Sequence, residues 1–171
     1  MRPWTLLIGI CVITLVAVSG YLWWRSSGLE EVPDITVVTT SGEKLALAEM
    51  RGKPLLVTFW STTCPTCIEE MPHLIDLYHE FSPQGLRIIA IASYYDPPNL
   101  VLALQKRRGI PYTIALDIDA RAARAFGDAG VTPTTFLIAP DGHVVYRKTG
   151  RIDVQKVRRE ILAMLMPART S

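Results

Sequence analysis

Two cysteines separated by two residues are the side chains in this sequence most suited to chemistry. Cys64 and Cys67 enclose Pro65-Thr66. The chain has three cysteines, an odd count that argues against a scaffold of structural disulfides. A bond across two residues closes a loop too small to constrain the unfolded chain much. The pair therefore predicts a reversible dithiol and not a structural staple.

A metal-binding interpretation of this pair finds few partners in the sequence. A closed zinc site needs four ligands, but the chain has only three histidines and no second cysteine pair. Haem attachment needs a histidine directly after the second cysteine, where Ile68 stands. We expect no metal and no cofactor. One alternative stays open, a Cu(I)-binding thioredoxin-like module in which His143 joins the two thiolates.

The dithiol is predicted to lie at the start of a helix. Apolar residues recur every three or four positions between Cys64 and Phe81. Thr62-Thr63 can cap this helix, and Pro65 suits its first turn. The positive end of the helix dipole favours a thiolate, so we expect the pKa of Cys64 to fall below the free value of ~8.5. Cys64 is then the nucleophile, and Cys67, one turn later on the same face, is the resolving thiol.

The other elements are predicted from hydrophobic periodicity and turn residues. Residues 54–60 are apolar almost throughout, which indicates a central strand covered on both faces. Asp119 is expected to open a short helix and Asp141-Gly142 to form a hairpin turn. Further strands are expected over 35–40, 43–47, 86–93, 112–116, 134–139 and 143–148, and further helices over 98–108, 119–126 and 153–165. This order predicts an α/β fold with an N-terminal β-hairpin and a central mixed sheet flanked by helices.

The N-terminus differs in character from the rest of the chain. Trp4 to Trp24 is a run of 21 residues without a charge. At about 1.5 Å per residue it spans roughly 30 Å, the thickness of a bilayer's hydrocarbon core. We predict a transmembrane anchor over 1–25, a linker over 26–33 and a domain over 34–171 on the exported side. An alternative is a signal peptide cleaved near Ala17-Val18-Ser19.

Charge excludes one class of partner. The formal net charge is only +2, with basic residues scattered among acidic ones. Such a chain offers no electrostatic basis for binding nucleic acid. A protein or a small molecule is the expected partner, and a monomer the expected state.

Two separate segments carry a family resemblance. The first is Phe59-Trp60-Ser61-Thr62-Thr63-Cys64-Pro65-Thr66-Cys67 with Glu70 and Pro72, and the second is Val131-Thr132-Pro133-Thr134-Thr135-Phe136-Leu137-Ile138 before Asp141-Gly142. Together they resemble the membrane-tethered thioredoxins of the TlpA, ResA and CcmG (DsbE) group. The resemblance implies a thioredoxin-like fold with a strand-helix insertion between Tyr94 and Tyr112.

The resemblance also implies catalytic roles beyond the cysteines. Pro133 would be a cis-proline beside the dithiol. Glu70 would exchange protons with Cys67, with a raised pKa if it is buried. A solvated helix glutamate is the alternative for Glu70.

Client binding is implied at four further positions. Thr132 would offer its backbone to an incoming strand, and the other expected contacts are Trp60, Pro65 and Thr66. Thr63 departs from the group, many of whose members carry an aromatic residue directly before the first cysteine.

The activity implied is that of a thiol-disulfide oxidoreductase. We predict a dithiol reductant of exported client proteins, with apocytochrome c as a client to test, kept reduced by a membrane-embedded thiol carrier. The predicted location is the bacterial inner membrane, single-pass, with the catalytic domain facing the periplasm. A dithiol oxidant of exported or stress-related proteins stays open, because direction depends on redox potentials.

Overall fold

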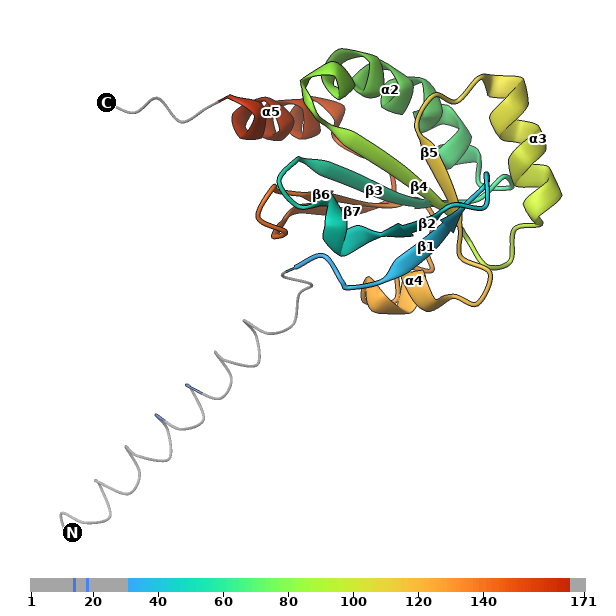
Figure 1. Cartoon of the computed structure of the whole chain (residues 1–171), viewed down its shortest axis with the longest axis horizontal. Coiled ribbons are helices and arrows are strands. Elements are labelled where there is room, and N and C mark those ends of the chain that lie inside the picture. Colours follow the sequence, from blue (N-terminus) through green and yellow to red (C-terminus); the bar gives the residue numbers. More distant parts are fainter. Residues whose placement is uncertain (1–13, 15–17, 19–30, 167–171) are drawn as a thin grey trace, which may run out of the picture.

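A seven-stranded mixed sheet forms the centre of the chain, with helices on both of its faces (Figure 1). The computed structural model describes residues 14, 18 and 31–166. The strands are β1 (Thr36–Thr39), β2 (Lys44–Ala46), β3 (Leu55–Trp60), β4 (Arg87–Ala92), β5 (Thr113–Leu116), β6 (Thr134–Ile138) and β7 (Val144–Thr149). The α-helices are α2 (Pro65–Phe81), α3 (Pro98–Arg108), α4 (Arg121–Ala125) and α5 (Val154–Leu165), and two short 3₁₀ turns are η1 (Leu47–Met50) and η2 (Ser82–Gln84).

The strand order across the sheet is β2-β1-β5-β4-β3-β6-β7. Strands β3, β4 and β5 run parallel, whereas β1, β2, β6 and β7 pair antiparallel with their neighbours. The predicted α/β fold with a mixed sheet is confirmed. Because β3 lies between β4 and β6 and all six of its residues are buried, the predicted central strand is confirmed as well.

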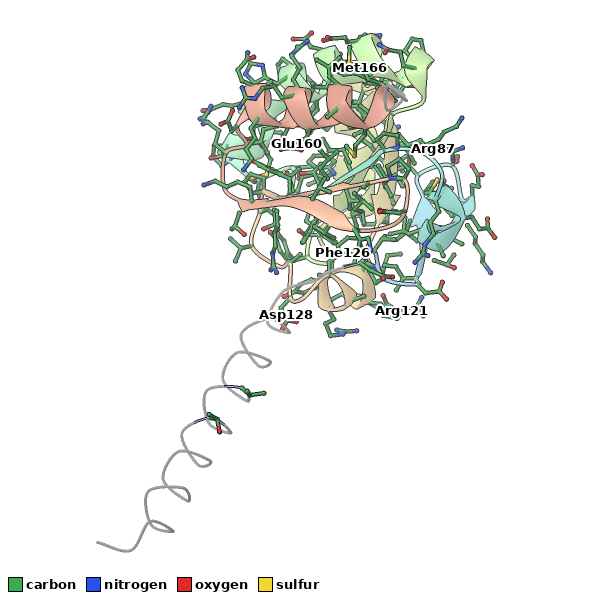
Figure 2. The ribbon with its side chains drawn as sticks, turned by 90° about the vertical axis from the view of Figure 1, so that its left-hand side faces the viewer. Arg87, Arg121, Phe126, Asp128, Glu160 and Met166 are labelled. Carbon is green, nitrogen blue, oxygen red and sulfur yellow. A yellow bond between two sulfur atoms is a disulfide. The ribbon has the colours of Figure 1, made fainter. Side chains whose placement is uncertain are left out.

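Alternate residues of β3 supply the two halves of the core. Leu56 and Trp60 pack on the face covered by α2, α3 and α5. Leu55, Val57 and Phe59 pack on the other face, together with Phe126 at the end of α4. Figure 2 shows Phe126 between the sheet and α4. The site therefore stands on a strand that is fixed by packing on both faces.

The predicted hairpin at residues 141–142 joins β6 to β7. Gly142 has a φ of +99°, a backbone conformation that glycine adopts without steric cost. Its N–H donates to the Ala139 carbonyl, and the Ala139 N–H donates to the His143 carbonyl at 2.8 Å. The N-terminal hairpin of β1 and β2 is confirmed too.

Three sequence predictions need correction. The Tyr94–Tyr112 segment contains helix α3 and no strand, because β5 begins at Thr113. Helix α4 begins after Ala120. Asp117 accepts the backbone N–H groups of Ala122 and Ala123, whereas the predicted cap Asp119 accepts only that of Arg121, at 3.3 Å.

The third correction concerns the start of the domain, which was predicted at Asp34. Glu31 already pairs with His143, and the Val32 N–H donates to the Gly142 carbonyl at 2.8 Å. Val32 is only 6% exposed and belongs to the core. The last three residues of the predicted linker thus lead into the fold, with Glu31 bridged to His143 and Val32 buried in the core.

The predicted transmembrane anchor, residues 1–25, lies outside the described residues except for Thr14 and Val18. In the part of the chain that the structure describes, no helix combines the length and the apolar character needed to cross a bilayer.

Candidate active site

The two cysteines lie at the N-terminus of α2, directly after the loop that leaves β3. They form a disulfide with their Cα atoms 5.3 Å apart. Cys64 itself is the N-cap, and its Sγ accepts the Cys67 N–H at 3.2 Å. The predicted cap at Thr62-Thr63 is wrong, because Cys64 has the extended backbone (φ −91°, ψ 106°) of a capping residue. The first sulfur thus lies where unpaired helix N–H groups favour negative charge.

The two sulfurs differ in access to solvent. Cys64 is half-buried, whereas Cys67 is 3% exposed and packs in the core. Pro65 is exposed and Thr66 half-buried beside them. An incoming disulfide can therefore reach Cys64 directly, and Cys67 only from within the chain.

A small cavity lies behind the buried sulfur. Its volume of about 10 Å³ is at the lower limit of the room that one water molecule needs. It is lined by Thr58, Trp60, Cys67, Glu70, Met71, Leu74, Ala90, Tyr112 and Pro133. Three of the four residues predicted to be catalytic therefore meet at one place, Cys67 and Glu70 from α2 and Pro133 from the loop before β6.

Glu70 is the buried acid of this cavity. It is 2% exposed, and its Oε1 accepts the Ile152 N–H at 2.5 Å. Burial is the largest influence and raises the pKa of Glu70 above its usual 4.5, while the Ile152 hydrogen bond and the charges of Arg151 and His73 act in the opposite direction. Its neighbour Glu69 is exposed and forms an ion pair with Arg151. Of the two adjacent glutamates, only Glu70 faces the dithiol.

Two aromatic residues, Trp60 and Tyr112, complete the lining of this cavity. Trp60 is 3% exposed, so the structure buries this predicted client contact in the core. Among the described residues, its Nε1 is the buried side-chain polar atom that lacks a hydrogen-bond partner. Burial also raises the pKa of the Tyr112 phenol, which keeps it neutral.

The loop before β6 brings the predicted proline to the site. The Thr132–Pro133 peptide bond is cis, as the resemblance implied. Pro133 is buried and lines the cavity with Cys67. Thr132 is half-buried, and its Oγ1 lies 3.4 Å from the Tyr95 hydroxyl. The site thus has a buried floor, formed by the cavity residues, and a partly exposed rim that includes Pro65, Thr66 and Thr132.

The residues between β3 and the dithiol are held by a side chain that the sequence did not reveal. Asp96, in the turn after β4, accepts hydrogen bonds from both the backbone and the hydroxyl of Thr62. No local pattern predicts this contact, because the partners are 34 residues apart. The Glu70 partner Ile152 was missed for the same reason.

A metal site at the dithiol lacks a third ligand in the described residues. No group of three or more His, Cys, Asp or Glu side chains in that part of the chain could hold an ion. His143 lies in the β6–β7 turn, at the opposite end of β6 from Pro133. The length of β6 therefore separates it from the sulfurs, at about 3.3 Å per residue.

Known proteins match this chain over nearly its whole length. The Redoxin family matches residues 29–162. The thiol-disulfide oxidoreductase ResA of Bacillus subtilis (strain 168) is 28% identical over 173 residues, which cover 100% of this chain and 95% of that protein. ResA of Halalkalibacterium halodurans is 33% identical over 138 residues, 81% of this chain and 77% of that protein.

A solved structure agrees. The thiol:disulfide interchange protein of the thioredoxin family from Chlorobium tepidum TLS superposes with a TM-score of 0.71 and is 27% identical, covering 80% of this chain and 97% of that one. These matches agree with the site, which has an accessible cysteine at a helix N-terminus and a buried partner one turn away. The chain belongs to the Redoxin family and is a thiol-disulfide oxidoreductase of the ResA type.

Proposed function

We propose that this enzyme is a dithiol reductant of exported proteins, with Cys64 as the nucleophile and Cys67 as the resolving thiol. The observation that carries the proposal is the difference between the two sulfurs. Cys64 is reachable and accepts a helix N–H, whereas Cys67 is buried beside Glu70. One sulfur is suited to meet the client and the other to release it.

The reaction begins with the reduced dithiol. The Cys64 thiolate attacks one sulfur of a client disulfide; the client S–S bond breaks, and one client sulfur leaves as a thiolate that takes up a proton. The Cys67 sulfur then loses its proton and attacks Cys64 Sγ, which releases the second client thiol. Two electrons pass to the client, and the enzyme ends with the Cys64–Cys67 disulfide.

Glu70 is proposed as the proton acceptor for Cys67. The two residues lie one helical turn apart and line the same small cavity, through which a proton would pass between them. Because burial raises the pKa of the Glu70 carboxyl group, that pKa is closer to the pKa of a thiol, which favours proton exchange between Glu70 and Cys67. Pro133 is proposed to shape the client side of the same site.

Client contacts are proposed on the open rim. Thr132 would pair its backbone with an extended client segment, beside Pro65 and Thr66. Trp60 would support the client site by lining the cavity beneath it and would not touch the client, since its side chain is buried. Apocytochrome c is the first client to test, on the strength of the resemblance.

The setting follows from the N-terminal sequence. We propose that residues 1–25 anchor the chain in the bacterial inner membrane with the catalytic domain in the periplasm, where a membrane-embedded thiol carrier re-reduces it. The uncharged run from Trp4 to Trp24 supports this placement. A monomer is the expected state.

Catalysed reduction of insulin disulfides tests the activity. With dithiothreitol as the electron source, the wild-type enzyme is expected to speed insulin reduction, and Cys64→Ser is expected to remove the acceleration. Cys11→Ser is the matched control, because it removes the chain's remaining cysteine and should leave the rate unchanged. Activity retained by Cys64→Ser would contradict the assignment of the nucleophile.

A further inference from the structure

We infer that Asp96 is a positioning residue for the reaction of Cys64, acting through Thr62. The inference rests on the proposed role of Cys64 as the nucleophile. Asp96 lies in the turn between β4 and α3, and Thr62 lies two residues before Cys64. The carboxylate would fix the loop that delivers the sulfur and would not itself touch the reacting atoms.

Both oxygens of Asp96 are used on a single residue. Oδ2 accepts the Thr62 N–H at 2.6 Å, and Oδ1 accepts the Thr62 hydroxyl at 2.5 Å. The carboxylate is only 5% exposed, so these bonds replace most of its hydration. Charge-assisted hydrogen bonds are short and about twice as strong as neutral ones. Two of them in parallel fix both the backbone and the side chain of Thr62.

The turn that carries Asp96 is itself held in place. The Ser93 N–H donates to the Trp60 carbonyl at 2.9 Å, and the Asp96 N–H donates to the Ser93 carbonyl at 2.9 Å. The turn is thus joined to the end of β3 at one point and to Thr62 at another. Asp96 therefore links the position of the sheet to the connection between β3 and α2.

The same turn also reaches the opposite rim of the site. The Tyr95 hydroxyl lies 3.4 Å from Thr132 Oγ1, beside the cis-proline. Residues 93–96 consequently contact the chain on both sides of the dithiol. A fixed turn would hold the nucleophile loop and the cis-proline loop at a constant separation.

The loop between Thr62 and the sulfur is short. The Cys64 N–H donates to the Ser61 carbonyl at 3.2 Å, and the Thr63 N–H donates to Ser61 Oγ at 3.2 Å. A shift of Thr62 would therefore move Cys64 relative to the Cys67 N–H that its Sγ accepts. Misplacement by about 1 Å can cost about 100-fold in rate.

The test is the rate at which reduced Cys64 attacks dipyridyl disulfide, followed by release of thiopyridone. This small reagent needs no client surface. Asp96→Ala is expected to slow the attack about tenfold, the loss of roughly one charge-assisted hydrogen bond. Asp96→Asn is expected to restore the rate to within about twofold, since its amide oxygen can accept the Thr62 N–H and its amide group can donate to the hydroxyl.

Asp117→Ala is the matched control. Asp117 is 4% exposed and accepts two backbone N–H groups, from Ala122 and Ala123, at the start of α4. Its loss should lower the free energy of unfolding in the same way and leave the Cys64 rate unchanged. A purely structural role of Asp96 would make the two alanine variants equally fast.

Three results would overturn the inference. The first is an unchanged rate in Asp96→Ala, and the second is an equal slowing in Asp117→Ala. The third is a rate in Asp96→Asn as low as that in Asp96→Ala, which would show that the charge of Asp96, and not its hydrogen bonds, sets the rate. If Asp96→Ala fails to fold, Thr62→Val removes one of the two bonds and is expected to slow the attack about threefold. An unchanged rate in that variant would overturn the inference too. If alkylation of the reduced wild-type enzyme with less than one equivalent of iodoacetamide, followed by peptide mapping, finds Cys67 modified instead of Cys64, the proposed function itself fails.

Discussion

Replacement of Cys67 by alanine is expected to convert the enzyme into a covalent trap for its client. The nucleophile remains at the helix N-terminus with its access unchanged, so the first step proceeds. The second step loses its attacking sulfur. The mixed disulfide on Cys64 should therefore accumulate.

The size of the effect follows from the geometry of the second step. Cys67 attacks from one helical turn away, within the same folded chain. Well-oriented intramolecular groups act with effective molarities of about 10⁵ M or more, which external thiols at millimolar concentration do not approach. Multiple-turnover reduction of clients should fall about 1,000-fold or further.

The adduct is measured by non-reducing electrophoresis and mass spectrometry after incubation with periplasmic proteins. Cys67→Ala should retain clients that dithiothreitol releases, and the Cys64→Ser/Cys67→Ala double variant should retain none. A turnover rate near that of the wild type, with no adduct, would show that another group resolves the mixed disulfide.

Replacement of Glu70 by glutamine is expected to slow the resolving step about 100-fold at neutral pH, the lower range for a lost general base. The amide oxygen of glutamine can still accept the Ile152 N–H, so the β7–α5 connection should stay in place. It cannot accept the Cys67 proton. Attack by Cys64 on the client should change little, since Glu70 lies behind the other sulfur.

The pH profile gives the sign of this effect. The Glu70 carboxylate can accept the thiol proton only above its pKa, which burial raises. The wild-type resolving rate should therefore climb as pH rises through that pKa, and Glu70→Gln should lack this rise. Single-turnover release of a client from Cys64 measures it. Glu69→Gln is the control, because its exposed carboxylate pairs with Arg151 and should leave the profile unchanged.

Stability reports the same titration independently. Because the folded-state pKa is above the ordinary 4.5, the folded protein binds the proton more tightly than the unfolded chain does. Its free energy of unfolding should fall as pH rises from 4.5 to the folded-state pKa. Glu70→Gln should not show this fall in urea unfolding experiments. Identical pH dependence in the two proteins would place Glu70 in solvent and contradict its burial.

Local patterns predicted the elements that position the dithiol. The apolar run at 54–60 identified β3 because a strand buried on both faces needs no polar alternation. Spacing also identified α2 and the face that Cys64 and Cys67 share. These features depend on neighbours in sequence, which is why one sequence was enough.

Contacts between distant segments escaped prediction. The cap of α2 was assigned to Thr62-Thr63, but Cys64 itself is the N-cap. At the start of α4 the sequence indicated Asp119, whereas Asp117 accepts two of the first three N–H groups and Asp119 one. Asp96 reads as an ordinary residue before two prolines, and its partner Thr62 becomes visible only when β3 and β4 are paired. Trp60 was expected to contact clients, but its side chain lies on the face of β3 that packs into the core.

The central claim, reduction of clients by the Cys64–Cys67 dithiol, is tested most directly by the midpoint potential of that pair. Equilibration with glutathione buffers, followed by trapping of free thiols, gives the value for the folded protein. The account predicts a potential well below about −200 mV, in the range of dithiol reductants. A value near about −120 mV, that of a strong dithiol oxidant, would contradict it.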